Sequence, residues 1–215
     1  MGSLLVKFEK LTERFVPRFL LTIIVMLVLI SGYLLLNNNL EHKVDLFLPL
    51  DGMIPYLPWT IVIYATLYVL YMAVTVVLDS KAYTQVLADL ILMTLISFVF
   101  FTIITSHYPR PPASAWADSI WKPLIDLMVS IDAPGNTCPS LHVSTSIYLA
   151  LVLRQRPYGA LWVFWGILVS LSTLTLKQHF VWDWIGGVIL ALAVIKLNPW
   201  TSAKIDRLRQ TGLTN

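Results

Sequence analysis

Two histidines and one aspartate at the edges of strongly apolar segments are the residues of this chain best suited to chemistry. Ionisable side chains at such positions are costly and usually functional. His179 and Asp183 are four residues apart, so on a helix they share a face and the carboxylate can hold one imidazole nitrogen. His142 comes from a different segment and completes a minimal set of acid, base and nucleophile for a phosphate ester. These residues predict a membrane enzyme.

The composition places most of the 215 residues in lipid. Hydrophobic residues make up 57% of the chain and charged residues only 13%, against about a quarter in soluble domains. A net charge of +3 is too small and too dispersed to indicate a nucleic-acid partner. The single cysteine, Cys138, excludes an intrachain disulfide and a multi-cysteine metal site. We expect one all-α membrane domain over residues 1–215, with the bilayer and a membrane lipid as partners and homo-oligomerisation left open.

Six segments are predicted to cross the membrane, where a spanning helix needs about 20 largely apolar residues. Five are clear from their apolar content. The sixth, 141–153, is short and rich in Ser and Thr, which suits a helix buried among its neighbours. The first runs into three asparagines without a small-residue cleavage site, so a retained anchor is expected rather than a removed signal peptide. The predicted spans are 19–36, 54–78, 86–104, 141–153, 161–176 and 180–197.

Basic residues are distributed unevenly between the two ends of these spans, eleven against four. The positive-inside rule therefore predicts that both termini are cytoplasmic. His142, His179 and Asp183 then all lie at the outer interface. Short loops and compact size favour a prokaryotic inner membrane with a periplasmic or extracellular site. The cytoplasmic set is Lys7, Lys10, Arg14, Arg18, Lys81, Arg154, Arg156, Lys196, Lys204, Arg207 and Arg209, and the outer set is Lys43, Arg110, Lys122 and Lys177.

The long outer connection, residues 106–139, contains a second structural signal. Between Trp116 and Val129, apolar residues alternate with charged ones at helical spacing. The pattern predicts an amphipathic helix that lies in the membrane interface. Such a helix can be a plain anchor or a lid over the site.

Three motifs follow one another along the chain: Arg110-Pro111, then Pro139-Ser140-Leu141-His142, then Ser172 with His179 and Asp183. In order and type they resemble the motifs of the type-2 phosphatidic acid phosphatase superfamily. The resemblance covers about residues 50–197 and implies a six-helix membrane fold.

This resemblance implies a role for each candidate residue. His179 would attack a lipid phosphate and form a phosphohistidine, with Asp183 orienting its imidazole. His142 would protonate the departing alcohol and then take a proton from the incoming water or hydroxyl. Arg110 and Ser140, with Lys177, would bind the substrate phosphate. No carboxylate cluster suited to a divalent metal accompanies these residues, so no metal or other cofactor is expected.

Departures from the superfamily pattern bear on the substrate. Ile103 and Thr173 stand where the superfamily has Lys and Arg, and Leu141 replaces a glycine. These departures resemble the branch that contains inositol phosphorylceramide and sphingomyelin synthases, which transfer a phospho-headgroup between lipids. A phosphodiester carries less charge than a phosphomonoester, so it needs fewer cations. Hydrolysis of a lipid phosphate with Lys177 and Arg110 as the cations stays open beside transfer.

Simpler explanations accompany each of these assignments. His179 and Asp183 could form a structural ion pair, and Ser140 could only cap a helix. Arg110 and Lys177 could be ordinary residues at headgroup depth. A lipid transporter or scramblase that uses the same fold without catalysis is the alternative function. It would need a continuous path of polar residues through the core, whereas here the charged groups gather at one interface.

Overall fold

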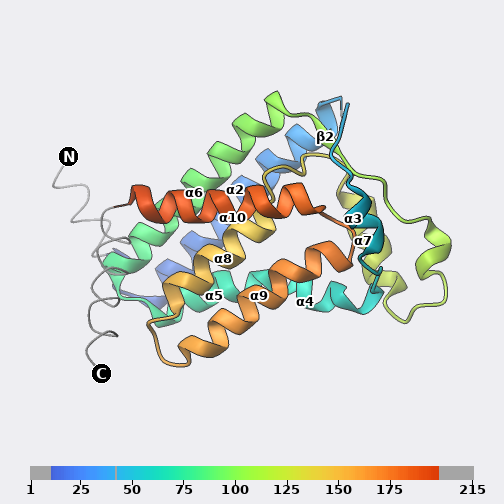
Figure 1. Ribbon diagram of the computed structural model, residues 1–215. Coiled ribbons are helices and arrows are strands. Elements are labelled where there is room, and N and C mark those ends of the chain that lie inside the picture. Colours follow the sequence, from blue (N-terminus) through green and yellow to red (C-terminus); the bar gives the residue numbers. More distant parts are fainter. Residues whose placement is uncertain (1–10, 42, 199–215) are drawn as a thin grey trace, which may run out of the picture.

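The computed structural model describes residues 11–41 and 43–198, which form a bundle of helices (Figure 1). Two-residue strands, β1 (Val44–Asp45) and β2 (Ser106–His107), pair in parallel at one end of the bundle. The helices are α2 (Phe15–Asn39), α3 (Pro49–Met53), α4 (Ile61–Ala65), α5 (Leu67–Val77), α6 (Ser80–Ile103), α7 (Lys122–Ile131), α8 (Leu141–Leu153), α9 (Gly159–Thr175) and α10 (Val181–Leu197), with 3-10 turns η1 (Pro58–Thr60) and η2 (Ala113–Trp116).

Both ends of the described chain lie at the same end of the bundle. Thr12 and Ser80 share a hydrogen bond between their hydroxyls at 2.6 Å. At the same end, Asn198 donates to the carboxylate of Asp89 at 2.9 Å. The segments that contain α3, α7 and the two strands occupy the opposite end (Figure 1). The chain therefore returns to that opposite end just before α4, before α8 and before α10.

Among the described residues, three helical segments are long and apolar enough to cross a membrane: Phe15–Asn39, Pro58–Val77 and Ser80–Ile103. Leu141–Leu153 and Gly159–Thr175 are shorter apolar helices, and α10 has 17 residues. These helices are compatible with a membrane protein. The count of six spans, the position of the termini and the identity of the membrane stay predictions. Five residues in the charge asymmetry, Lys7, Lys10, Lys204, Arg207 and Arg209, lie outside the described residues.

Helix α2 carries a large exposed apolar surface. Only 6% of its most apolar stretch is buried. An apolar surface of this extent is a site of contact with lipid or with another protein. More than half of each of several large side chains is exposed along it: Leu20, Ile24, Leu27, Val28 and Leu35.

Helix α8 lies at the centre of the bundle and packs against α5, α6, α9 and α10. It begins at Leu141 and ends at Leu153, as the sequence predicts. The hydroxyls of Ser144 and Ser146 are buried and donate to backbone carbonyl oxygens of the helix itself, at 3.2 and 3.1 Å. Serine can therefore be tolerated in this interior because its polar atoms are satisfied locally.

Two glycines allow the neighbouring helices to approach α8 closely. A Cβ atom at Gly166 of α9 would lie 2.6 Å from the Cβ of Ala150. At Gly187 of α10 it would lie 2.8 Å from both the carbonyl oxygen of Ser140 and the Cβ of Val143. Glycine is therefore required where α10 crosses the beginning of α8.

We expect Gly187→Ala to lower the free energy of unfolding by about 1–3 kcal/mol, because the added methyl overpacks a helix contact. Gly52→Ala is the matched control, since its Cβ would lie 3.6 Å from Phe47, an ordinary contact. Denaturant titration of both variants in detergent measures the difference. Equal stability of the two variants would contradict the close approach of α10 to α8.

Two expected helices differ in detail from the sequence analysis. The segment 54–78 is not one helix but η1, α4 and α5, with a break at Thr66. The Thr66 hydroxyl accepts the indole N–H of Trp165 at 3.0 Å, and this contact between helices accompanies the break. The expected interfacial helix begins later, at Lys122, and ends at Ile131, with a proline in its first turn.

Candidate active site

The beginning of α8 carries His142 in its first turn. Ser140 caps the helix, because its Oγ accepts the backbone N–H of Val143 at 3.2 Å. The Ser140 backbone N–H donates to the carbonyl oxygen of Asp183 at 3.1 Å. This bond joins the first turns of α8 and α10 and sets the distance between the residues that they carry.

The connection from α9 to α10 positions His179. Lys177 is in the left-handed region, with φ 57°, and its N–H donates to the carbonyl oxygen of Leu174. The next two N–H groups, of Gln178 and His179, both donate to the carbonyl oxygen of Thr173, at 3.0 and 3.2 Å. This pattern is a Schellman turn, which ends α9 and holds the backbone of His179 close to it.

Asp183 is fully buried in the first turn of α10. Its Oδ2 accepts the N–H of Phe180 at 2.9 Å and lies 3.7 Å from Nδ1 of His179. The second distance is that of an ion pair rather than a hydrogen bond. Within the described residues, His179 Nδ1 has no hydrogen-bond partner. A small rotation of the imidazole would direct Nδ1–H at the carboxylate and leave Nε2 as the reacting nitrogen.

The imidazole of His142 lies face to face with the ring of Tyr64 from α4. The ring centroids are 3.9 Å apart, the planes differ by 15°, and the Tyr64 hydroxyl is 3.2 Å from Nδ1. A hydroxyl can accept as well as donate a hydrogen bond. The Tyr64 oxygen can therefore accept Nδ1–H of His142 whether the imidazole is neutral or protonated. Nε2 is buried without a partner in the part of the chain that the structure describes. It is therefore the nitrogen available for proton transfer.

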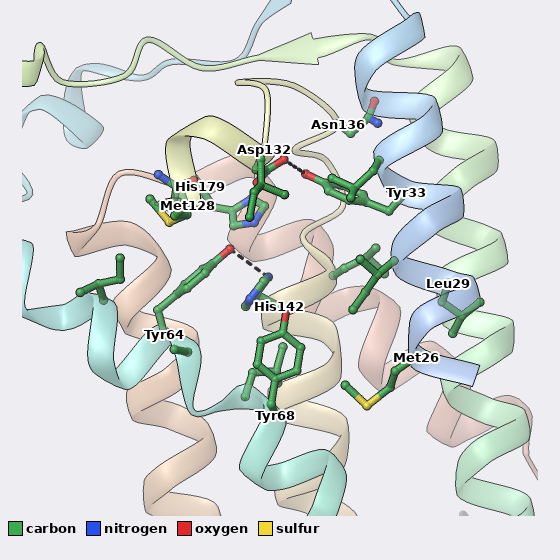
Figure 2. Close-up of a pocket in the computed structure, with 18 of the residues that line it drawn as sticks. Met26, Leu29, Tyr33, Tyr64, Tyr68, Met128, Asp132, Asn136, His142 and His179 are labelled. Atoms are coloured by element: carbon green, nitrogen blue, oxygen red, sulfur yellow. Dashed lines mark hydrogen bonds between the residues drawn. The ribbon is translucent and has the colours of Figure 1, made fainter. Parts of the chain in front are cut away.

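His142 and His179 face one cavity of about 320 Å³, with ring centroids 6.4 Å apart (Figure 2). Asp132 lies close to His179, whereas Asn136, which also lines the cavity, lies farther from both histidines, beside α2 (Figure 2). Much of the rest of the wall is apolar, which suits an amphiphile whose polar group reaches the histidines. The apolar residues contributed by α2 and α7 include Met26, Leu29, Ile30, Leu124, Leu127 and Met128.

The structure brings His142, His179 and Asp183 together but places Arg110, Ser140 and Lys177 outside the cavity lining. The predicted phosphate-binding roles of these three residues therefore stay predictions. Ser140 is fully buried as the cap of α8.

Arg110 is bonded to the protein on several sides. Its Nε and Nη2 donate to the hydroxyl of Tyr108 at 3.2 and 2.9 Å, and Nη2 also donates to the carbonyl oxygen of Asp132. Nη1 donates to the carbonyl oxygen of Val129 at 3.3 Å. The Tyr108 hydroxyl in turn donates to Oε1 of Gln178 at 2.9 Å, and both of these residues line the cavity. Arg110 thus reaches the cavity only through Tyr108 and the end of α7.

Lys177 donates from Nζ to the carbonyl oxygen of Asp51 at 2.6 Å. Burial lowers the pKa of the Lys177 amine, while the nearby Asp51 carboxylate opposes that shift. The Asp51 carboxylate itself accepts the N–H groups of Leu48 and Val181, both at 2.8 Å. This network attaches α3 to the beginning of α10.

We expect Lys177→Gly to be more stable than Lys177→Ala by about 1 kcal/mol, because only glycine is unstrained at a left-handed position. Both variants lose the bond to Asp51, so their difference isolates the backbone effect. Denaturant titration provides the comparison. If the amine also binds the substrate phosphate, both variants will show the same rise in KM, at least about tenfold for one charged hydrogen bond.

Two cavity residues, Tyr64 and Asp132, were not singled out by the sequence analysis. Asp132 follows α7, and its Oδ1 accepts the hydroxyl of Tyr33 at 2.8 Å and the amide of Asn37 at 2.7 Å. Burial raises the pKa of the Asp132 carboxyl, although the bond from Tyr33 and the charge of Arg110 oppose the shift. In the sequence, only their positions could have indicated these two residues, since both stand near the outer ends of apolar or amphipathic segments.

Cys138, just before the beginning of α8, is the one cysteine of the chain. Burial, aided by the charge of Asp183, raises the pKa of the Cys138 thiol to about 12. The thiolate is therefore not available as a nucleophile near neutral pH. Across residues 11–41 and 43–198, no three His, Cys, Asp or Glu side chains are grouped as metal ligands.

This geometry defines a class: a helical, membrane-compatible protein in which two imidazoles lie at one cavity and a buried carboxylate lies beside one of them. Residues 104–206 match the sequence model of the PAP2 superfamily, whose members are generally phosphoesterases or phosphatases. The matched stretch contains both histidines and Asp183. It does not distinguish the inositol phosphorylceramide synthase-like branch, which stays a prediction. No curated protein and no solved structure matches the chain.

Proposed function

We propose that the chain is an integral-membrane lipid phosphatase or phosphotransferase that works through a phosphohistidine on His179. The observation that carries this proposal is the pair of imidazoles, 6.4 Å apart between ring centroids, at one cavity with an apolar wall. A phosphoryl group between the rings would have its attacking and leaving atoms on opposite sides, as in-line transfer requires.

The reaction would proceed in two steps, formation of the phosphohistidine and its breakdown. Nε2 of His179 attacks phosphorus, the bond to the leaving oxygen breaks, and His142 donates a proton to that oxygen. Asp183 stabilises the charge that develops on His179. Water or a second alcohol then attacks phosphorus and gives its proton to His142, the bond from phosphorus to Nε2 of His179 breaks, and both histidines are restored.

The charges around the cavity bear on the choice of substrate. No Lys or Arg is among the described residues that line it. A phosphomonoester dianion would lack a direct cationic partner there, whereas a phosphodiester carries a single negative charge. This absence supports diester chemistry, and with it headgroup transfer, over hydrolysis of phosphatidate. We place the site at the outer leaflet, with both termini cytoplasmic, on the charge asymmetry of the sequence.

Turnover by the purified full-length chain on a panel of lipids tests the proposal. Release of inorganic phosphate from phosphatidate or polyprenyl pyrophosphate would indicate hydrolysis. Appearance of the phospho-headgroup on an added ceramide or diacylglycerol, without free phosphate, would indicate transfer. Absence of both reactions across the panel, together with lipid movement in vesicles that survives His179→Ala, would overturn the enzyme and favour a scramblase.

A further inference from the structure

We propose that Asp132 is a specificity-determining residue, whose carboxylate rejects doubly charged phosphates from the cavity by charge. The proposal rests on the proposed phosphoryl transfer and assigns the choice between its substrates to one side chain. Asp132 lines the cavity and lies close to His179, the proposed nucleophile (Figure 2). A phosphate that His179 can attack is therefore also exposed to the charge of Asp132.

Hydrogen bonds hold the Asp132 carboxylate at the wall of the cavity. Its Oδ1 accepts the hydroxyl of Tyr33 at 2.8 Å and the side-chain amide of Asn37 at 2.7 Å. Both partners belong to α2, so the carboxylate is fixed to that helix and is not free to turn away from a substrate. Burial raises the pKa of the carboxyl, while the bond from Tyr33 and the charge of Arg110 oppose that shift. Contacts of this kind favour the ionised form.

No cation in the described part of the chain is in direct contact with this carboxylate. Neither Lys nor Arg forms an ion pair with Asp132 across residues 11–41 and 43–198. Arg110 donates to the backbone carbonyl oxygen of Asp132, not to its carboxylate, and its other donors are bound to Tyr108 and Val129. Arg110 therefore offsets only part of the charge. Among the described residues that line the cavity, Asp132 is the only acidic one, and none is Lys or Arg.

One carboxylate acts unequally on substrates of different charge. Above its second pKa a phosphomonoester carries two negative charges, whereas a diester carries one, so the repulsion is about twice as large for the monoester. Two unit charges within about 10 Å, at an effective dielectric constant of about 20, interact by at least the roughly 1.4 kcal/mol that corresponds to a tenfold change. Specificity requires only this difference between the two substrates. The lack of a lining cation removes a reason to bind a monoester, and Asp132 adds a reason to reject it.

The test uses two lipids that differ by one charge and one methyl group. Phosphatidate and phosphatidylmethanol with the same chains are compared at about pH 8.5, where the monoester is a dianion. Wild type is compared with Asp132→Asn, which removes the charge but keeps an oxygen that can accept from Tyr33 and Asn37. Asp118→Asn is the matched control. It removes the same charge from the same connection between α6 and α8, at an exposed position outside the cavity lining.

Turnover is followed as the loss of each lipid, measured by mass spectrometry. We expect Asp132→Asn to raise kcat/KM for phosphatidate relative to phosphatidylmethanol at least about tenfold over wild type. Asp118→Asn should keep the wild-type ratio. A loss of Asp132 that was merely structural, or that removed an acid or base, would lower kcat/KM for both lipids by the same factor. That result would overturn the proposal.

Binding measured without turnover separates this proposal from the proposed phosphoryl transfer. In a His179→Gln background, native mass spectrometry should show phosphatidylmethanol bound at least about tenfold more tightly than phosphatidate. Adding Asp132→Asn should remove most of this preference. Equal binding of the two lipids before Asp132 is changed would overturn the proposal, even if Asp132→Asn failed to fold. The binding preference with no turnover of either lipid by wild type would support selection by Asp132 and contradict the phosphoryl transfer.

Discussion

Replacing His179 with glutamine should reduce lipid turnover by at least about 10⁴-fold, the scale on which covalent catalysis is lost with its nucleophile. Glutamine fills similar space but cannot form the phosphoramidate bond on which the proposed mechanism depends. The fold should survive, because Nδ1 of His179 makes no hydrogen bond within the described residues and the backbone is fixed by the turn at Lys177. Initial rates on the preferred lipid measure the loss. Rapid quenching in alkaline detergent with ³²P-labelled lipid should trap label on wild type that later acid treatment releases, and none on the variant.

His107→Gln is the matched control for this experiment. His107 belongs to β2, is half-buried and does not line the cavity. We expect it to keep the turnover rate of wild type within about twofold, as is usual for changes away from a site. Turnover by His179→Gln at a similar rate, or trapped label that persists in that variant, would rule out His179 as the nucleophile.

The sequence was sufficient to predict which catalytic candidates meet. Apolar segments alternate in direction through the bundle, so His142 and His179, each at the beginning of a segment that starts from the same end, must lie at one end of it. Serine before an apolar run predicts the cap at Ser140, and the four-residue spacing predicts the proximity of His179 and Asp183. These inferences need only local patterns and the order of helices.

The surroundings of the site could not be predicted in this way. Arg110 was expected to bind the phosphate. The direction of its side chain is set by hydrogen bonds to Tyr108 and to the carbonyl oxygen of Val129 near the end of α7. Lys177 occupies a left-handed position where glycine is the usual residue. Because no glycine marks this turn, the Schellman motif could not be predicted from the sequence. Tyr64 reaches His142 across 78 residues. Side-chain direction at a non-local contact is set by packing, which no local pattern encodes.

Replacing His142 with glutamine should have an effect that depends on the leaving group. Without a general acid, departure of a lipid alcohol should slow by about 10³-fold, within the range for acid–base catalysis. Nitrophenolate leaves without a proton, so its first-turnover burst from a nitrophenyl phosphodiester should slow less than about tenfold. The later turnovers should still be slow, because His142 also has to take a proton from the attacking water. Stopped-flow release of nitrophenolate separates the burst from the steady state.

This pattern distinguishes proton transfer from a structural role. A structural loss at His142 would disturb the contact with Tyr64 and the beginning of α8, and would slow both leaving groups by the same factor. Tyr64→Phe provides the intermediate case, since it keeps the stacked ring and removes only the hydroxyl 3.2 Å from Nδ1. We expect it to show the same dependence on the leaving group, with a smaller factor. His179→Gln should lose the burst with both substrates, because attack on phosphorus precedes every other step.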